Sequence, residues 1–449
     1  MKLELYGRPI NIRRLIPILV LIVAALVAAV IFLPAGMVRL AIVSLLVLPF
    51  AMFLFDRPTP VFYLMIIVLF SNIDVYIPFP AYRYLPLFLL VSLIVSFILG
   101  RKIVVHNILF VTLTCAFVLI AFTSLIVARD IDSSLYRLSK FVKTLISIAI
   151  ASQFVTGRKE FRRFFLVLAV SILMSSFLPL ILPRPAQYPG PALIWATGVF
   201  RYEGFIFDPN VFALMQVFLV PILLFLIAVY RRPLLARPFF LVALTASVAV
   251  FVMTFSRAGF VSLASLLFLL IIIERRNPAV LVVVSVLIVA GIILTPDIYW
   301  ERIKSLGHLG AGALEDYSIF IRRETAKIAI DMGLKHPILG VGIENFLYHL
   351  PRYNVLWIYM DLVHNAFLEV LSVLGIIAFS IFLGIIWYNT RVIRNLMKRR
   401  HDREARQLGR LLLVQLLAIL VHALFMPVTF HFILWYMFAI PSFARYAYR

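Results

Sequence analysis

One part of the chain has no charged side chain over twenty consecutive residues. It reads VFALMQVFLVPILLFLIAVY and runs from Val211 to Tyr230. A helix of about 20 mostly apolar residues spans the hydrocarbon core of a bilayer. Residues 107–128 and 278–295 are also uncharged and of similar length. These stretches predict transmembrane helices.

The composition extends this interpretation to the whole chain. Of the 449 residues, 64% are apolar and 14% are charged, and the mean hydropathy is +1.07. An ordinary soluble chain is about half apolar and about a quarter charged. The composition therefore excludes a cytosolic enzyme and a disordered protein, and it predicts an all-α polytopic membrane protein with about 12–14 transmembrane helices.

The apolar runs between charged or Pro/Gly breaks define the predicted spans. The first follows Arg13 and Arg14 but is longer than the apolar core of a signal peptide, so we expect it to be a retained helix. The predicted spans are 15–34, 38–55, 59–72, 84–99, 107–128, 136–155, 164–183, 211–230, 238–255, 258–274, 278–295, 364–388, 411–427 and 430–444.

Positive charge alternates between successive loops. If the N-terminus is cytoplasmic, the cytoplasmic segments carry 26 of the 42 Lys and Arg residues. Cytoplasmic loops of membrane proteins are enriched in these residues. We therefore predict that both termini are cytoplasmic. The net charge of +22 then reflects membrane topology, and no nucleic-acid partner is expected.

Two outer segments are long, and the second mixes charged with apolar residues. We expect that segment to contain helices at the outer membrane surface, with Tyr299 and Trp300 among the lipid headgroups. The predicted domains are N-terminal transmembrane helices (1–183), transmembrane helices with arginine-bearing outer loops (184–295), a large outer loop (296–363) and C-terminal transmembrane helices (364–449).

Two arginines lie in outer loops, against the charge rule. Arg201 lies in VFRYEGFIFDPN, and Arg257 lies in TFSRAG, a turn so short that it holds this arginine at the membrane surface. Two guanidinium groups from separate loops can bind a phosphate or pyrophosphate through paired hydrogen bonds. Alternatively, each pairs with an acid such as Glu203 or Asp208, or extends to lipid headgroups.

Further basic residues have weaker patterns. Arg137, Lys140 and Lys143 recur every three residues, so they share one helix face and can hold an anionic lipid head or contact bulk lipid phosphates. Arg322 and Arg323 either approach a bound phosphate or form the solvated face of a surface helix, and the pattern favours the second interpretation.

The long outer loop also contains HPILGVG, from His336 to Gly342. The backbone N–H groups of a Gly-x-Gly turn can bind an anion. A helix end followed by a turn produces the same pattern, so both interpretations stay open.

His364 and Asn365 begin a span at the outer surface, and Glu369 shares a helix face with Asn365. Histidine titrates nearest neutrality and can take a proton from an attacking hydroxyl, although a single interfacial histidine is often structural. The other histidines have no metal-ligand spacing, and Cys115 is the only cysteine. We predict no metal site and no intrachain disulfide.

Four motifs together resemble the O-antigen ligase/polymerase superfamily over roughly residues 190–390. They are FRYEG with Asp208-Pro-Asn210, SRAG, HPILGVGIENF and His364-Asn365. Lipopolysaccharide O-antigen ligases carry His-(Asn/Ser/Gln), nine residues, then Gly, and here this Gly is Gly375. The small or polar residue that follows three positions later in the family is Ala378 here, which is a departure.

The resemblance implies a GT-C-like glycosyltransferase of the bacterial inner membrane with a large helical periplasmic loop and an active site that faces the periplasm. Such enzymes use no nucleotide sugar, cofactor or metal. They take a glycan from undecaprenyl pyrophosphate, and ligases transfer it to lipid A-core oligosaccharide with inversion. By resemblance, Arg201 and Arg257 would bind pyrophosphate and His364 would be the base. The expected substrate-binding residues are Arg322, Arg323, Asn365, Arg137, Lys140 and His336.

Related activities fit the same pattern. An O-antigen polymerase or a protein O-oligosaccharyltransferase would use the same lipid-linked donor. A flippase or transporter of the lipid-linked glycan is a third possibility, but such proteins often have interrupted, repeated helices and charges within their spans. Charged residues in the middle of the predicted spans are nearly absent apart from Glu369, which favours a transferase.

Overall fold

The computed structural model describes residues 3–5, 8–10, 58–76, 81–98, 104–182, 193–196, 199–206, 208–230, 235–304, 317–353 and 362–449. The first two predicted spans lie outside these residues. The chain divides into two compact units, residues 1–65 with 83–102 and residues 66–82 with 103–449. The first unit contains the hairpin β1 (Leu3–Leu5) and β2 (Arg8–Ile10) and most of α4 (Ala81–Ile98), and α3 (Pro58–Ser71) crosses the boundary.

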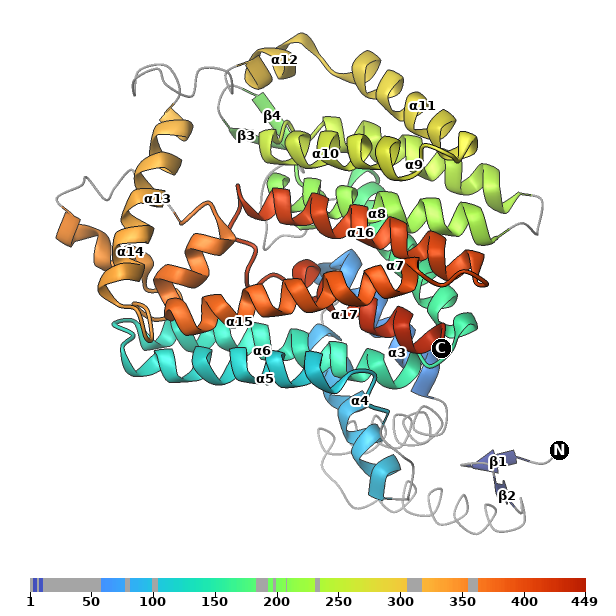
Figure 1. Cartoon of the computed structure of the whole chain (residues 1–449), viewed down its shortest axis with the longest axis horizontal. Helices are drawn as coiled ribbons and strands as arrows, with labels where there is room; N and C mark the ends of the chain where they lie inside the picture. Colours follow the sequence, from blue (N-terminus) through green and yellow to red (C-terminus); the bar gives the residue numbers. More distant parts are fainter. Residues whose placement is uncertain are drawn as a thin grey trace, which may run out of the picture. The chain divides into compact units, whose positions relative to one another are not determined.

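The second unit is a helical bundle that contains all the predicted site residues. Each predicted span from residue 107 onward is a helix (Figure 1). These helices are α5 (Ile108–Thr123), α6 (Ile131–Phe154), α7 (Arg158–Phe177), α8 (Pro209–Val229), α9 (Ala236–Val252), α10 (Arg257–Ile273), α11 (Pro278–Leu294), α15 (Ala366–Met397), α16 (Arg403–Ala423) and α17 (Phe432–Ala447).

The surface and interior of this unit both have membrane character. Among the described residues, five helices are long and apolar enough to cross a bilayer, α8, α15 and α16 among them. Large apolar side chains on other helices are exposed, such as Leu119, Val242 and Ile293, which a water-soluble surface would not present in such number. In contrast, α8 is apolar all round and buried along most of its length, as expected for a helix at a bundle centre. The prediction of an all-α membrane protein is confirmed, with two short hairpins as exceptions.

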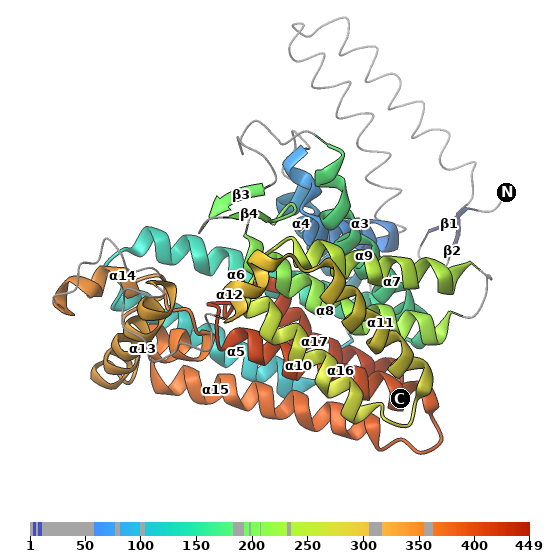
Figure 2. The same ribbon diagram turned by 90° about the horizontal axis from the view of Figure 1, so that it is seen from above.

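Successive helices of the bundle run in alternating directions. Helix α15 packs against α5, α16 and α17, and α16 also packs against α8 and α10 (Figures 1 and 2). As a result, α6, α8, α10, α15 and α17 begin at the end where α5, α7, α9 and α16 finish. We call this the motif end, because all four sequence motifs lie there.

Ion pairs connect helices at the opposite end of the bundle. Arg158 pairs with Asp402 at 2.5 Å, Arg410 pairs with the buried carboxylate of Glu274 at 2.6 Å, and Arg162 pairs with Glu404. The polar residues at this end therefore bind one another across the helices.

Helix α15 is interrupted in its third turn. Gly375 has φ 80° and ψ −178°, which no α-helical residue adopts. Residues 337–342, which follow α13 (Tyr317–Lys335), pair with this break through their main chain. The N–H groups of Val341 and Gly342 donate to Ser372 O and Val373 O at 2.9 and 3.0 Å, and Ile376 N–H donates to Pro337 O at 2.7 Å.

This pairing decides between the two interpretations of HPILGVG. The Gly340 N–H also donates within the protein, to His336 O at 3.0 Å. The backbone N–H groups at 340, 341 and 342 thus all have main-chain partners. These N–H groups are therefore not available to an anion, and the structure supports the other interpretation, a helix end followed by a turn.

We expect Gly340→Ala and Gly375→Ala to destabilise the protein. Both glycines have positive φ, and an added Cβ would lie 2.3 Å from Val373 C and 2.5 Å from Pro337 O, respectively. Each substitution should cost at least about 1–3 kcal/mol, because backbone cannot move aside as a side chain tip can. Thermal unfolding in detergent measures the loss. Gly291→Ala is the matched control, since a Cβ there meets nothing within 4 Å. Equal unfolding temperatures for all three variants would contradict the role of the break.

Candidate functional site

The Arg201 side chain bonds to the turn that precedes Arg257 at the motif end. Arg201 Nε donates to Thr254 O at 2.8 Å, and its Nη2 donates to Asn210 Oδ1 at 2.9 Å. The same Asn210 oxygen accepts a hydrogen bond from Ser256 Oγ at 2.8 Å. Because Ser256 immediately precedes Arg257, Asn210 connects the two arginines. We call this group of residues the arginine turn.

A hairpin that the sequence did not predict carries Arg201. Strands β3 (Leu193–Ala196) and β4 (Val199–Tyr202) pair antiparallel, with Ile194 opposite Arg201. The Tyr202 N–H donates to Met253 O at 2.8 Å, and the buried Tyr202 hydroxyl donates to Ser176 O at 2.7 Å. These bonds fix the hairpin to the ends of α7 and α9.

The residues of the SRAG motif each have a local role. Ser256 caps α10 by accepting the Gly259 N–H at 3.1 Å. Gly259 allows α10 to approach α8, because a Cβ there would lie 2.6 Å from the Cβ of Ala213. Arg257 is therefore the first residue of α10, and it is half-buried.

The position of Arg257 is electrostatically unusual. A helix N-terminus carries partial positive charge and exposed N–H groups, which favour anions and disfavour cations. An arginine in the first turn thus adds positive charge where the helix already supplies it. Such an arrangement suits a bound anion such as a phosphate.

Tyr299 supports the arginine turn from the outer segment. Its hydroxyl donates to Ser256 O at 2.8 Å, and its ring packs on Phe255 with centroids 5.2 Å apart. Tyr299 is 1% exposed and lies in α12 (Asp297–Lys304). The prediction that it lies among lipid headgroups was wrong, since it is packed inside the protein.

The start of α15 is tied to the loop before α17. Asn365 Oδ1 caps α15 by accepting the N–H groups of Phe367 and Leu368 at 2.9 and 3.1 Å. Thr429 Oγ1 donates to Ala366 O at 3.0 Å. His364, half-buried, directly precedes this cap. The side-chain oxygen of Asn365, predicted to bind substrate, thus has a structural role.

The two neighbouring arginines of α13 differ in their surroundings. Arg323 is exposed, and its guanidinium interacts with Glu324 at 3.3 Å, as expected for the solvated face of a surface helix. Arg322 is half-buried on another face and interacts electrostatically with His422 of α16. Of this predicted pair, only Arg322 is directed into the bundle.

Asn345 anchors the HPILGVGIENF segment to the start of α6. Its Oδ1 accepts the N–H groups of Arg129 and Asp130 at 2.8 and 2.7 Å, and its Nδ2 donates to Ser134 Oγ at 2.8 Å. The fully buried Asn345 side chain therefore joins parts of the chain more than 200 residues apart.

The remaining predicted ligands lie near this anchor and interact with protein groups. Arg137 forms an ion pair with Glu344, and the Lys140 ammonium lies 4.2 Å from the centre of the Tyr136 ring. The ring of His336 packs on that of His349, with centroids 5.9 Å apart. These contacts give each of the three residues a structural role beside the predicted one.

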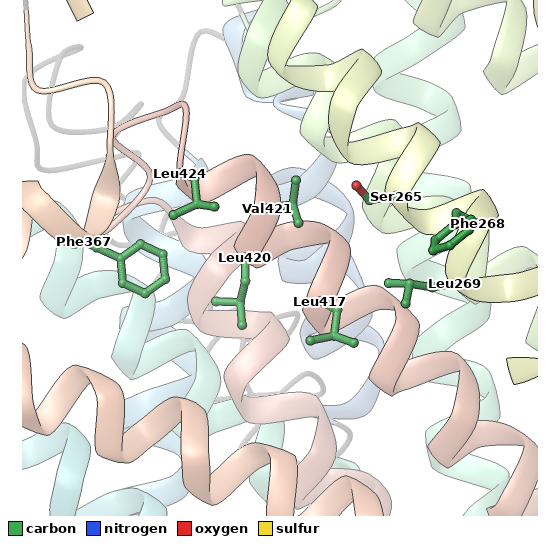
Figure 3. A pocket seen from close by; sticks show the side chains of 8 residues that line it. All are labelled: Ser265, Phe268, Leu269, Phe367, Leu417, Leu420, Val421 and Leu424. Atoms are coloured by element: carbon green, nitrogen blue, oxygen red, sulfur yellow. The ribbon is translucent and has the colours of Figure 1, made fainter. Parts of the chain in front are cut away.

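An apolar groove lies between α10 and α16, with a volume of about 410 Å³ (Figure 3). It extends to the start of α15, where Phe367 lies two residues after Asn365. Its lining residues are Ser265, Phe268, Leu269, Phe367, Leu417, Leu420, Val421 and Leu424.

Sequence reasoning missed several residues that build the site. Asn210 and Ser256 lie within the sequence motifs, but no role was predicted for either. No role was predicted for His422, because it has no metal-ligand spacing. Among the described residues, no group of three or more His, Cys, Asp or Glu side chains is arranged to hold a metal ion.

Comparison with known proteins gives one family. Residues 240–383 match the family model described as O-antigen ligase. This range extends from α9 into α15 and includes Arg257, Arg322 and His364, whereas Arg201 and Arg137 precede it. No curated protein matches the chain significantly. The match supports the predicted resemblance to the O-antigen ligase/polymerase superfamily.

We expect Asn210→Ala to destabilise the protein by about 1–3 kcal/mol, because the Arg201 and Ser256 donors would lose their shared acceptor. Asn210→Asp keeps an acceptor oxygen at this position and should unfold within a few degrees of the unmodified protein. Thermal unfolding of both variants is the measurement. An Asn210→Ala variant as stable as Asn210→Asp would show that Asn210 does not hold the arginine turn together.

Acid should loosen the segment that contains α14 (Phe346–His349). Burial, with a contribution from Arg129, Arg352 and His336, lowers the pKa of His349 from 6.5 to about 4. Between these values the unfolded segment binds a proton that the folded one does not, so its stability falls as pH falls. Hydrogen exchange of residues 340–353, corrected for its intrinsic pH dependence, should therefore be faster at pH 5 than at pH 7.

His349→Phe is the control for this prediction, because it fills the same space without a titrating group. Asp130 also has a lowered pKa, to about 2, because Ser133 and Tyr348 donate hydrogen bonds to it, but it titrates below the window tested. The same acceleration in His349→Phe would assign the effect to another group.

Proposed function

We propose that this member of the O-antigen ligase/polymerase superfamily is an O-antigen ligase. It would take a glycan from undecaprenyl pyrophosphate and transfer it to lipid A-core oligosaccharide at the periplasmic face of the bacterial inner membrane. The match over residues 240–383 supports the class of enzyme, and the ligase motif His364-Asn365 with Gly375 favours ligase over polymerase.

The observation that carries the proposal is the arginine turn. Arg201 and Arg257, 56 positions apart in sequence, are brought together by Asn210 and Ser256 beside the N-terminus of α10. The hydrogen bonds from Arg201 to Thr254 O and Asn210 Oδ1 orient its guanidinium. The two arginines and the N-terminus of α10 would therefore stabilise the negative charge that develops on a leaving pyrophosphate.

The reaction is a substitution at the anomeric carbon of the donor glycan. The acceptor hydroxyl oxygen forms a bond to this carbon from one face, while the bond from the carbon to the pyrophosphate oxygen breaks on the other face. The anomeric centre is therefore inverted. Undecaprenyl pyrophosphate leaves with the electron pair, and the arginines stabilise the charge on it.

His364 would accept the proton of the attacking hydroxyl. The Asn365 cap and the hydrogen bond from Thr429 to Ala366 fix the chain directly after His364. The apolar groove between α10 and α16 offers a surface of the right chemistry for part of an isoprenoid chain, and α10 is also the helix that begins with Arg257.

A transfer assay with purified protein tests the proposal. Undecaprenyl-pyrophosphate-linked glycan and lipid A-core without O-antigen would be mixed with the protein in the presence of EDTA. We expect Arg257→Ala to lower the rate by about 100-fold to 1,000-fold, and His364→Ala by about 100-fold to 10,000-fold. Arg257→Lys should fall between Arg257→Ala and the unmodified protein, because it keeps the charge but loses the paired donors.

Two neighbouring residues give a matched control. Arg322→Ala should slow transfer, whereas Arg323→Ala, on the solvated face of the same helix, should leave it unchanged.

Longer glycans that stay on the undecaprenyl carrier would identify a polymerase instead. Full activity in both Arg257→Ala and His364→Ala would overturn the mechanism.

A further inference from the structure

His422 is a fully buried histidine at the motif end of α16. Its Nδ1 lies 3.0 Å from Ser262 Oγ on α10. The Ser262 hydroxyl also donates to Ala258 O at 2.8 Å. This pair connects α16 to the helix that begins with Arg257.

The contact between Nδ1 and Ser262 Oγ is compatible with either tautomer of His422, and we assign the proton from the two hydrogen bonds of Ser262. A serine hydroxyl has one proton, and that of Ser262 is given to Ala258 O. Nδ1 is therefore the donor to Ser262 Oγ. In the neutral imidazole, Nε2 then carries a lone pair and is a hydrogen-bond acceptor.

Nε2 of His422 is buried and has no hydrogen-bond partner among the described residues. Leaving a buried acceptor unpaired costs about 1–3 kcal/mol, so such an atom needs an explanation. One explanation is a bound molecule that donates a hydrogen bond to this nitrogen. Ser262 fixes the ring, so Nε2 would be held ready for that donor.

The surroundings of His422 indicate which donor fits. Arg322 and His431 interact with it electrostatically, and Ser262 lies five residues, or about 7.5 Å of helix rise, after Arg257. The apolar groove begins beside the pair, at Ser265 and Val421. A pyrophosphate esterified at both ends carries no proton at neutral pH, so it offers acceptors to Arg322 but no donor to a lone pair. A sugar hydroxyl offers that proton.

We propose that His422 Nε2 accepts a hydrogen bond from a sugar hydroxyl of a glycan-bearing lipid bound at the motif end. This rests on the proposed function for the identity of the two lipids. The glycan belongs to the donor or to the acceptor, and Ser262 is the positioning residue that keeps the lone pair on Nε2.

Two substitutions of His422 test the hydrogen bonds of Nδ1 and Nε2 separately. The asparagine of His422→Asn places its amide nitrogen near Nδ1, so it can still bind Ser262 but leaves the Nε2 position empty. The glutamine of His422→Gln places a polar atom near Nε2 and gives up the bond to Ser262. Ser262→Ala removes that same bond while leaving the imidazole in place.

The experiment measures binding of four lipids to full-length protein in nanodiscs, beside thermal unfolding and transfer. The lipids are undecaprenyl-pyrophosphate-linked glycan, undecaprenyl pyrophosphate, lipid A-core, and lipid A without core. We expect His422→Asn to bind one glycan-bearing lipid about 10-fold more weakly and both glycan-free lipids normally. His422→Gln should stay within about threefold for all four. The glycan-bearing lipid that is affected identifies which substrate carries the hydroxyl.

Two results would overturn the inference. The first is that His422→Asn binds all four lipids like the unmodified protein. The second is that it loses glycan-free and glycan-bearing lipids equally, which would reflect packing. The proposed function fails separately: if the unmodified protein binds the lipids but transfers nothing, a glycan-specific loss in His422→Asn still supports the role of His422. If Ser262→Ala and His422→Gln unfold early while His422→Asn binds normally, the pair is structural only.

Discussion

A helix in a membrane protein can be interrupted only if the freed backbone groups find partners, because the surrounding hydrocarbon offers none. The break of α15 at Gly375 meets this constraint by pairing with residues 337–342. The pairing fixes the end of α13 to α15, and Asn345 then fixes the following residues to α6. The positions of Arg322 on α13 and of His364 before α15 thus depend on one set of main-chain hydrogen bonds.

This constraint also explains why two distant motifs occur together. The glycines at 340 and 375 are the places where two backbones approach too closely for a Cβ. Gly375, which is separated from His364-Asn365 by nine residues, and the Gly-x-Gly turn are therefore two halves of one structural feature. This feature contributes to the proposed reaction indirectly, because it positions residues at the motif end. Its N–H groups are bonded within the protein, so an anion would have to be bound by side chains.

The sequence predicted the helices because their apolar runs are long and their charges lie at the ends. It did not predict the β3–β4 hairpin, whose short strands are set by hydrogen bonds to α7 and α9 and not by a periodic pattern. The charge rule selected Arg201 and Arg257, but their proximity depends on Asn210 and Ser256, 46 residues apart. His422 could not be selected, since one histidine in an apolar helix is recognisable only by what surrounds it.

Ion pairs occur at both ends of the bundle, including the pair of Arg137 with Glu344 at the motif end. At the end opposite the motifs, Arg158, Arg162 and Arg410 each pair with a carboxylate of another helix, which stabilises the bundle. At the motif end, Arg322 lies near the C-terminus of α16, where the helix dipole favours a cation.

Arg257 has the opposite relation to its own helix, because it occupies the N-terminal turn that the dipole makes unfavourable for positive charge. Packing alone does not require an arginine there, since Ser256 supplies the cap and Gly259 the close approach to α8. A bound anion would be stabilised by both groups, because the helix N–H groups and the guanidinium would act on one ligand. The combination of a guanidinium group with helix N–H groups at one point is the physical basis for proposing that Arg257 binds a phosphate-bearing substrate.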